Sequence, residues 1–277
     1  MHKYLAVLCF LLVSYITAGD VTADEQDSYT FGVVPQFDAL TVYSIWRPLL
    51  DELERLTKLN FSLSGSATIP SFEQEFMCGK FDFAYMNPYH VILSQNDIGY
   101  IPLVRDTGRD LTGIVVVRTD SAISSIRDLN QRTVAFPSPY ALGATLLVRS
   151  ELRDDYQVEL VPQFVQSHSS VYLNVALGET DAGGGVQRTF EQQPEDIRGL
   201  LRILYRTRAV ASHPIVASPR VPAADREKVR NALLRLGKSE KGRALLAKIP
   251  VEKIGSASMA DYASVTKMLT AQLSSCR

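Results

Sequence analysis

Three polar side chains directly follow an apolar, strand-like segment of the chain. The segment covers residues 81–86 and stops at the turn pair Asn87-Pro88, and the next residues are Tyr89 and His90. In open α/β sheets, ligands bind just outside the carboxyl ends of the strands. We therefore expect the amide, phenol and imidazole of Asn87, Tyr89 and His90 to donate hydrogen bonds to a ligand. The alternative is a structural turn in which Tyr89 and His90 begin a short helix and become partly buried.

A second group of expected donors belongs to the backbone of residues 139–144. This segment enters a predicted helix directly after a predicted strand, and free N–H groups at a helix N-terminus attract anions because the helix dipole is positive there. The residues that we expect to contact an anion in this way are Tyr140, Ala141, Leu142 and Gly143. An ordinary helix start without a ligand explains the same segment equally well.

Arg188 is the expected positive charge of the site. It follows the glycine-rich segment 181–186, which we predict to be a strand. A guanidinium can bind an oxyanion through two parallel hydrogen bonds, so Arg188 would be the charge partner of an anionic ligand. The alternative is a surface ion pair with Glu191 or Glu195, which lie at helical spacing from Arg188.

Two further imidazoles complete the candidate site. His168 lies between a predicted strand and a predicted helix, where Ser169 or Ser170 would cap the helix and offer hydroxyl donors. A cap without ligand contact is equally compatible with these residues. His213 precedes another predicted strand. If His90, His168 and His213 face one cleft, the affinity for an anion should rise as the pH falls through the imidazole range.

Neither catalysis nor metal binding is predicted. His168, Ser169 and Asp181 are the residue types of a catalytic triad, but the Gly-x-Ser-x-Gly elbow is missing. The glycine run at 183–185 is not followed by the Lys-Ser/Thr pair of a phosphate loop. No Cys or His pair has the spacing of metal ligands. We therefore expect a binding protein that is not an enzyme and uses neither a cofactor nor a metal.

The N-terminus and the composition restrict the location and the partners. The 277-residue chain has a formal net charge of −1 with scattered basic residues, so nucleic acid, which requires a concentrated basic face, is not an expected partner. Residues 1–23 have a basic start, an apolar stretch too short to span a bilayer comfortably, and small residues before a polar run. They predict a cleaved secretory signal peptide, with a retained anchor as the alternative. Cys78 and Cys276 remain after cleavage, and bridged, free buried and ligand-linked thiols all stay open.

The elements that must position these residues alternate along the chain. Apolar runs predict strands at residues 29–35, 60–67, 81–86, 98–105, 111–118, 132–136, 158–166, 181–186, 201–209 and 214–217. Apolar periodicity predicts helices at residues 41–57, 72–78, 124–129, 141–152, 170–177, 188–199, 223–236, 241–247 and 259–273.

The alternation occurs in two successive runs, which predicts an α/β protein with two lobes. Each lobe is expected to be a mainly parallel sheet with helices on both faces. We assign residues 24–110 to lobe one, residues 111–205 to lobe two, and residues 206–277 to a return into lobe one. Two crossover segments would then form a hinge beside a cleft that closes on a ligand.

The order and spacing of short segments along the chain resemble the periplasmic solute-binding proteins of phosphonate, phosphite and phosphate ABC transporters. The segments that carry the resemblance are 31–35 (FGVVP), 46–49 (WRPL), 79–85 with 87–90, 128–129 leading to 134–139, His168 with 181–183, and 213–216. The resemblance covers nearly the whole mature chain. It implies a type II periplasmic-binding-protein fold, periplasmic localisation, a small oxyanion ligand, no catalysis, and a membrane ABC permease as partner. We expect a monomer.

Several positions depart from the residues that the resemblance implies. Ser and Thr hydroxyls are implied where this chain has Ala141, Leu142 and Gly143, so only backbone donors remain there. Acidic residues are implied at Arg188 and His213, and two cleft tyrosines are implied near Ile69 and Leu111. Because acidic groups suit the amine of an aminoalkylphosphonate, we expect a simple oxyanion or an organic acid without an amine instead.

Two other functions stay open on the same fold. A sensor that docks with its ligand on a membrane histidine kinase uses the same cleft closure, and neighbouring genes would distinguish it from a transport protein. A binder of sulfonates or thiamine-precursor pyrimidines would be favoured by aromatic residues stacking in the cleft. The candidates for such stacking are Phe37, Tyr43, Tyr89 and Tyr140.

Overall fold

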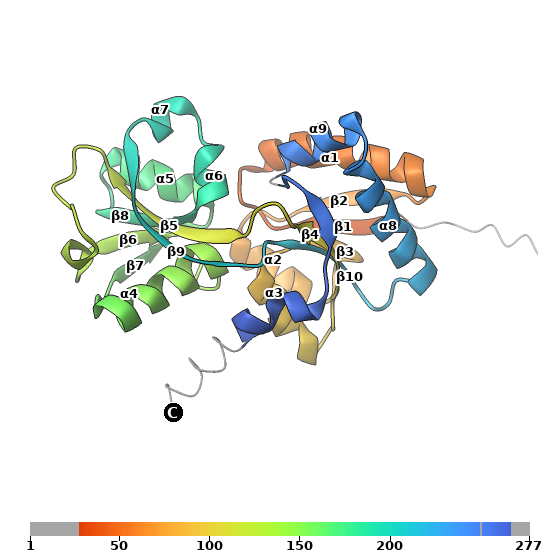
Figure 1. The fold of residues 1–277 in the computed structure, drawn as a ribbon, viewed down its shortest axis with the longest axis horizontal. Helices are drawn as coiled ribbons and strands as arrows, with labels where there is room; N and C mark the ends of the chain where they lie inside the picture. Colours follow the sequence, from red (N-terminus) through yellow and green to blue (C-terminus); the bar gives the residue numbers. More distant parts are fainter. Residues whose placement is uncertain (1–27, 250, 267–277) are drawn as a thin grey trace, which may run out of the picture.

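The structure of the protein is a computed structural model in which residues 28–249 and 251–266 are described. These residues form two β-sheets flanked by helices, placed side by side along the long axis of the molecule (Figure 1). We call the sheet that contains the first strand, together with its helices, lobe one, and the other sheet with its helices lobe two. The predicted signal peptide at residues 1–23, Cys276 and the end of the predicted helix at 259–273 lie outside the described residues.

Lobe one contains a six-stranded mixed sheet with the order β11-β4-β10-β3-β1-β2. The strands are β1 (Tyr29–Val33), β2 (Phe61–Gly65), β3 (Phe83–Tyr85), β4 (Ile101–Asp106), β10 (Pro214–Ala217) and β11 (Ile254–Ser256). β1 is parallel to β2 and β3, β10 is antiparallel to β3 and β4, and β11 is antiparallel to β4. Four of these six described strands therefore point the same way, and β10 and β11 are reversed.

Helices cover both faces of this sheet (Figure 1). They are α1 (Ala39–Thr57), α2 (Ile69–Met77), α3 (Pro88–Leu93), α8 (Ala223–Leu236) and α9 (Glu240–Lys248). α1 buries an apolar stripe at helical spacing that includes Val42, Trp46, Leu49, Leu50 and Leu53. Trp46 is the single tryptophan of the chain, and its ring centroid lies 4.9 Å from that of Tyr85 in β3.

Lobe two contains a five-stranded mixed sheet with the order β7-β6-β8-β5-β9. The strands are β5 (Leu111–Arg118), β6 (Thr133–Phe136), β7 (Val161–Phe164), β8 (Ala182–Val186) and β9 (Leu201–Val210). β6 is parallel to β7 and β8, and β5 is antiparallel to β8 and β9, so β5 alone among these described strands is reversed. The helical segments are a 3₁₀-helix at Ile126–Leu129, a π-helix at Leu142–Leu147, and then α4 (Val148–Tyr156), α5 (His168–Leu177), α6 (Gln187–Glu191) and α7 (Glu195–Arg198).

The central strand β5 has an apolar core on each side. Val115 and Val117 pack in one core with Val148 and Leu152 of α4. Ile114 and Val116 pack in a second core with residues of α5. Because successive side chains of a strand point to opposite faces, one uninterrupted apolar run supplies both cores. The apolar run at 111–118 in the sequence therefore reflects a strand buried on both faces.

The structure differs from the predicted elements at a few places. The helix predicted at 141–152 begins as a π-helix at Leu142, and β11 lies in a stretch for which no element was predicted. The helix after β7 begins at His168 and is capped by Ser167, whose hydroxyl accepts from the Ser170 amide over 3.1 Å. The predicted caps Ser169 and Ser170 are therefore wrong, because both residues lie inside the helix.

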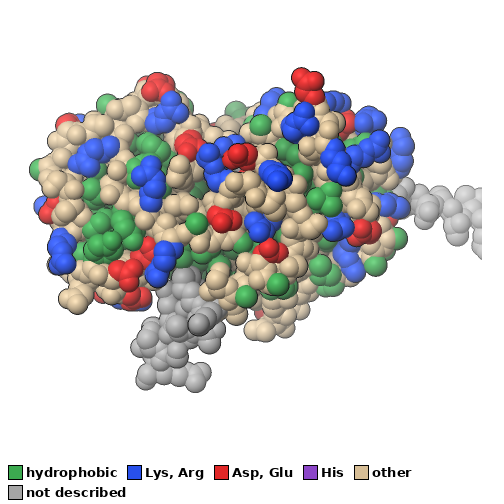
Figure 2. All heavy atoms as spheres, in the orientation of Figure 1, with side chains coloured by type: hydrophobic (Ala, Val, Ile, Leu, Met, Phe, Trp, Pro, Cys, Tyr) green, Lys and Arg blue, Asp and Glu red, His purple; other side chains and the backbone are tan. Residues whose placement is uncertain are grey.

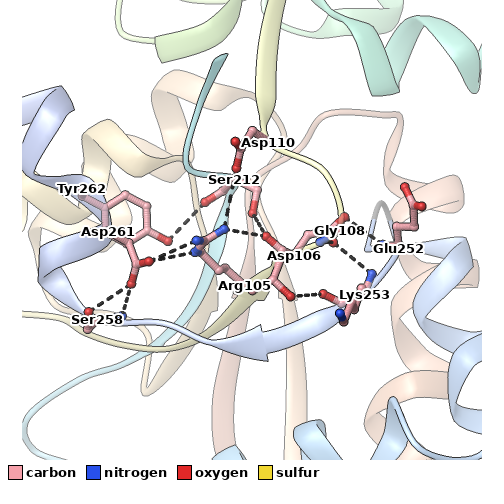
Figure 3. A network of polar contacts seen from close by, with 11 residues as sticks. Arg105, Asp106, Gly108, Asp110, Ser212, Glu252, Lys253, Ser258, Asp261 and Tyr262 are labelled. Atoms are coloured by element: carbon pink, nitrogen blue, oxygen red, sulfur yellow. Dashed lines mark hydrogen bonds and ion pairs between the residues drawn. The ribbon is translucent and has the colours of Figure 1, made fainter.

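Two chain segments connect the lobes, one between β4 and β5 and the other between β9 and β10. The Ser212 hydroxyl in the second segment donates to the carbonyl of Asp106, the last residue of β4, over 2.7 Å (Figure 3). The Tyr262 hydroxyl donates to the carbonyl of Ser212 over 3.2 Å. The two crossings are therefore joined to each other and to the C-terminal 3₁₀-helix at Met259–Tyr262. The lobe limits at residues 110 and 205 stay a prediction. In the structure β9 is paired with β5 of lobe two as far as Val210, five residues beyond the second limit.

Asp106 is the centre of this hydrogen-bond network. Its buried carboxylate accepts hydrogen bonds from the amides of Gly108, Glu252 and Lys253 over 2.8, 2.8 and 2.9 Å (Figure 3). The neighbouring Arg105 forms an ion pair with Asp261 over 3.1 Å. One acidic side chain thus fixes the turn after β4 and the segment before β11, which are far apart in the sequence.

The surface carries charges of both signs. Lys and Arg side chains are interspersed with Asp and Glu over both lobes on the face shown in Figure 2, and the surface is indented between the lobes. Cys78 is exposed, which excludes the buried thiol that was one alternative for this residue. Within residues 28–249 and 251–266, no helix combines the length and apolarity that crossing a membrane requires.

Candidate functional site

Two small, adjoining cavities lie between the lobes. The larger measures about 40 Å³ and the smaller about 10 Å³. Gln36, Val186 and His213 line both cavities. The larger cavity is also lined by Tyr85, Asp106, Arg109, Asp110, Leu111, Arg188, Thr189 and Ser212, and the smaller by Val34, Ile69, Asn87, Ala141, Leu142, Gly143, Ala144 and His168. Spaces of this size hold a compact group of atoms. A further space of about 190 Å³ adjoins the larger cavity and shares Arg188 and Leu111 with it.

The lining residues come from strand ends of both sheets. Asn87 follows β3, and His168 and Arg188 follow β7 and β8 of lobe two. His213 precedes β10, and because β10 is antiparallel to β3, its start lies beside the carboxyl end of β3. Ligands of open α/β sheets bind at the carboxyl ends of strands, and this rule leads to Asn87, His168 and Arg188, which the fold brings together here.

The backbone of residues 141–144 forms one wall of the smaller cavity. Ala141 precedes the helical run and supplies no side-chain cap, so the first amides of the run have no partner within the helix. The carbonyls of this segment press on glycines of two strands. A Cβ atom added to Gly113 of β5 would lie 2.1 Å from the carbonyl oxygen of Gly143, and one added to Gly184 of β8 would lie 2.4 Å from that of Ala144. Glycine at these two positions lets the segment lie directly on the sheet.

Arg188 lies in α6 and lines the larger cavity. Its Nε is buried and has no hydrogen-bond partner within the described residues. The alternative ion pair is not formed in this part of the chain, because Glu191 pairs with Arg109 over 2.7 Å and Glu195 pairs with Arg198. A buried, unpaired guanidinium N–H is costly unless a partner is supplied. The side chain is therefore available to an anionic ligand.

The two imidazoles at the cavities are held neutral. Burial lowers the pKa of His168 from its usual 6.5 to about 4. Burial, together with the neighbouring imidazoles of His168 and His90, lowers the pKa of His213 to about 3. In the ligand-free chain neither ring therefore gains a proton between about pH 8 and pH 5.5, which counts against a rise of anion affinity through the ordinary imidazole range; the affinity itself stays a prediction.

These lowered pKa values predict a loss of stability in acid. Below about pH 6.5 the unfolded chain binds protons on His168 and His213, whereas both rings stay unprotonated in the folded chain. The free energy of unfolding should therefore fall as the pH drops from about 6.5 to about 4. Each imidazole contributes a slope of about 1.4 kcal/mol per pH unit in this window. Urea unfolding followed by Trp46 fluorescence at several pH values measures the slope. His168→Gln should reduce it by about 1.4 kcal/mol per unit, and an unchanged slope in this variant would contradict the assignment.

Three predicted site residues do not line either cavity. Tyr89 and Tyr140 stack on each other across the lobes, with ring centroids 5.8 Å apart. His90 is fully buried behind Asn87 and stacks on Phe76, with ring centroids 4.8 Å apart. Ligand contact by these three residues stays a prediction. Their contacts in the structure agree with the alternative in which Tyr89 and His90 begin a short helix, which is α3.

Other lining residues were not predicted from the sequence. Gln36 lies three residues after the end of β1, and its amide nitrogen lies 3.4 Å from Nε2 of His213. The strand-end rule that led to Asn87 applies equally to Gln36. Ser212 and Asp106 line the larger cavity, but the Asp106 carboxylate is already bonded to three amides. No group of metal ligands is present within the described residues.

The aromatic candidates for a stacking ligand do not meet at the cavities. Phe37 belongs to the core of lobe one, and the Tyr43 side chain is exposed. Tyr89 and Tyr140 contact each other instead. Tyr85 is the aromatic ring at the larger cavity, and it stacks on His213 with ring centroids 5.4 Å apart.

Comparisons with known proteins agree with this architecture. A family model described as "ABC transporter, phosphonate, periplasmic substrate-binding protein" matches residues 31–262. The binding protein component of an ABC phosphonate transporter from Pseudomonas aeruginosa superposes with a TM-score of 0.78 at 17% identity, covering 88% of this chain and 86% of that chain. PhnD1 from Prochlorococcus marinus, solved in complex with methylphosphonate, has a TM-score of 0.78 at 14% identity, covering 87% of this chain and 96% of that one.

A third structure has a different bound molecule. XAC2383 from Xanthomonas citri, bound to ATP, has a TM-score of 0.68 at 18% identity, covering 88% of this chain and 98% of that chain. At these identities the solved structures support the fold, and the predicted two-lobed type II periplasmic-binding-protein fold is confirmed. The family model covers most of the sequence and decides the family. The chain belongs to the periplasmic substrate-binding proteins of phosphonate ABC transporters, a family that binds its substrate without catalysing a reaction.

Proposed function

We propose that this chain binds a small, singly charged oxyanion of the phosphonate, phosphite or phosphate class between its lobes and presents it to a membrane permease. The observation that carries the proposal is the buried Nε of Arg188, which has no partner in the described part of the chain and lies at a cavity between the lobes. An oxyanion would accept from this guanidinium and from the free amides that follow Ala141.

The proposed charge of the ligand follows from the charges at the cavities. The Asp106 carboxylate is bonded to three backbone amides, and Arg109 pairs with Glu191 over 2.7 Å. Asp110 lies 3.8 Å from the Arg105 guanidinium. With both cavity imidazoles neutral, Arg188 is the one unpaired charge among the described lining residues. A single positive charge matches a monoanion best, because a second negative charge would be buried without a partner.

The same charges favour a ligand without an amine. An ammonium group in the cavity would need a free carboxylate, and Asp106 is the buried acid there, with its oxygens already occupied by amides. The two cavities that reach lobe one, of about 40 and 10 Å³, also favour a compact group next to Gln36 and His213, while a space of about 190 Å³ adjoins them on the lobe-two side at Arg188. Methylphosphonate, the ligand of the Prochlorococcus marinus structure, meets both conditions. We therefore place methylphosphonate, phosphite and phosphate ahead of 2-aminoethylphosphonate.

A thermal-shift screen of residues 24–277 tests the proposal. The panel contains phosphate, phosphite, methylphosphonate, 2-aminoethylphosphonate, sulfate and several organic acids. A ligand at about 100 times its Kd adds roughly 2.7 kcal/mol to the free energy of unfolding, which raises the midpoint clearly. A shift with a compact phosphorus oxyanion and a smaller one with 2-aminoethylphosphonate is the expected result. A shift only with neutral or aromatic compounds would reject the oxyanion.

We also infer that the protein is exported. The family is periplasmic, and residues 1–23 combine a basic start with a short apolar stretch, which supports removal of this segment as a signal peptide. Mass spectrometry of the protein recovered from the periplasm should then find a chain that begins near Asp24. A chain that keeps Met1 and stays with the membrane would show a retained anchor instead.

A further inference from the structure

A polar cluster joins the two lobes beside the candidate site. Oε1 of Glu73, in α2 of lobe one, accepts a hydrogen bond from the Ser138 hydroxyl of lobe two over 3.2 Å. The same oxygen lies 3.2 Å from Nε2 of His90. Close by, Nδ2 of Asn87 donates to the carbonyl of Tyr140 in lobe two over 3.1 Å. Side chains of α2 and of the start of α3 therefore hold the segment 138–140 of the opposite lobe.

Ser138 connects this cluster to the amides at the smaller cavity. The Ser138 side chain is fully buried, and its carbonyl accepts from the Thr145 hydroxyl over 2.7 Å. The Thr145 amide donates to the carbonyl of Ala141 over 2.8 Å, within the turn that lines the cavity. The position of the Glu73 carboxylate thus fixes Ser138, and Ser138 fixes the turn that carries the free amides.

Glu73 has hydrogen-bond partners in both lobes. Its side chain is only 15% exposed, and its partners among the described residues are the Ser138 hydroxyl and the His90 ring, without a Lys or Arg. A carboxylate removed from water needs such donors. Separation of the lobes takes away Ser138, so this hydrogen bond exists only when the cleft is closed.

We propose that Glu73 is a positioning residue for ligand binding: its bond to Ser138 forms on closure, holds the amides after Ala141 against the cavity, and slows release of the ligand. The inference rests on the proposed function, because it assumes a ligand between the lobes. Glu73 does not line either cavity, so it acts through Ser138 and does not touch the ligand.

The test measures the rates of binding and release of methylphosphonate by stopped-flow fluorescence of Trp46. Trp46 contacts Tyr85, and Tyr85 stacks on His213 at the cavity, so the single tryptophan is coupled to the site by ring contacts. The variants are Glu73→Ala, Glu73→Gln, Ser138→Ala and the double variant of Glu73→Ala with Ser138→Ala. Glu75→Ala is the matched control, because Glu75 lies on the same helix but bonds to Ser66 and Lys80 within lobe one.

The expected result is a change in the release rate alone. Glu73→Ala should speed release about tenfold, the factor that one hydrogen bond to a charged group supplies, and should leave the association rate within about twofold. Ser138→Ala should have the same effect, and the double variant should be no worse than either single one. Glu73→Gln, which keeps an acceptor oxygen, should recover part of the loss. A purely structural role would instead lower the fraction of active protein without this separation of the two rates.

Two results would overturn the inference. Unchanged release in Glu73→Ala is one, and additive effects of Glu73→Ala and Ser138→Ala are the other. If the wild-type chain does not bind methylphosphonate, the proposed function is in question, and the contact is judged without ligand. Spin labels at the exposed positions Leu40 and Leu177, with Cys78→Ser and Cys276→Ser, then report the interlobe distance. Glu73→Ala should lengthen it relative to Glu75→Ala, and identical distance distributions would reject the role of Glu73.

Discussion

Arg188→Ala is expected to weaken the binding of methylphosphonate by about a hundredfold or more. Truncating one partner of a buried, hydrogen-bonded charge pair costs about 2–5 kcal/mol, and about 1.4 kcal/mol corresponds to a factor of ten in affinity. The Nε of Arg188 has no protein partner among the described residues, so this atom contributes no hydrogen bond to the fold and is available to the proposed ligand. The free energy of unfolding without ligand should therefore change by less than about 1 kcal/mol.

A matched control separates the role of this arginine from a general effect of charge. Arg132 pairs with Asp181 over 3.6 Å at the opposite edge of the lobe-two sheet, where β6 and β8 begin. Arg132→Ala removes the same charge and should leave the Kd within about twofold, since exposed ion pairs contribute little and distant charges are screened. Isothermal titration calorimetry of both variants at equal ionic strength measures the difference. Binding by Arg188→Ala within a factor of three of wild type would contradict the assignment.

Asp106→Ala is expected to cause the largest loss of stability. The carboxylate is 4% exposed and accepts from the amides of Gly108, Glu252 and Lys253. Its removal leaves three N–H groups without their acceptor, and hydrogen bonds to charged groups contribute about 1.5–3 kcal/mol each. We expect the free energy of unfolding to fall by about 3 kcal/mol or more, which lowers the midpoint by roughly 6–12 °C in a chain of this size.

Urea unfolding of the ligand-free protein measures this change. Asp106→Asn keeps one acceptor oxygen and should lose about half as much stability as Asp106→Ala. Asp110→Ala is the control, because Asp110 is exposed and lies 3.8 Å from Arg105, and it should change the stability by less than about 0.5 kcal/mol. A loss below about 1 kcal/mol in Asp106→Ala would show that the hydrogen bonds of this carboxylate, drawn in Figure 3, contribute little to the stability of the fold.

Most of the strands could be predicted because a buried strand is a run of apolar residues in the sequence. The apolar run at 111–118 indicates a strand buried on both faces, and β5 has this range in the structure. β11 has no such apolar run, because Ile254, Gly255 and Ser256 form a strand only by pairing with β4. The start of the helix at Leu142 is also a tertiary effect, since the carbonyls of its first turn press on glycines of β5 and β8.

The candidate site was predictable as far as it depends on strand ends. Asn87, His168 and Arg188 follow three strands whose carboxyl ends meet between the lobes, so residue type and position in the sequence are enough to find them. Whether a side chain after a strand faces the cavity or the core cannot be read from the neighbouring sequence. His90 follows Asn87 by three residues, yet its ring turns into the core against Phe76.

Contacts between distant residues could not be predicted in this way. Glu73 and Ser138 are 65 positions apart and meet only because the lobes are together. The neutral state of His213 depends on its burial beside two other imidazoles, which no short segment of sequence reveals. Both the pH behaviour and the interlobe contact therefore required the folded structure.

A crystal structure of the protein with methylphosphonate tests the central claim most directly. The expected result is a phosphonate group between the lobes, with oxygens within about 3.2 Å of the Arg188 guanidinium and of the backbone amides after Ala141. Glu73 and Ser138 should remain hydrogen-bonded in that closed state. A phosphonate bound outside the interlobe cavity, or inside it without contact to Arg188, would contradict the account.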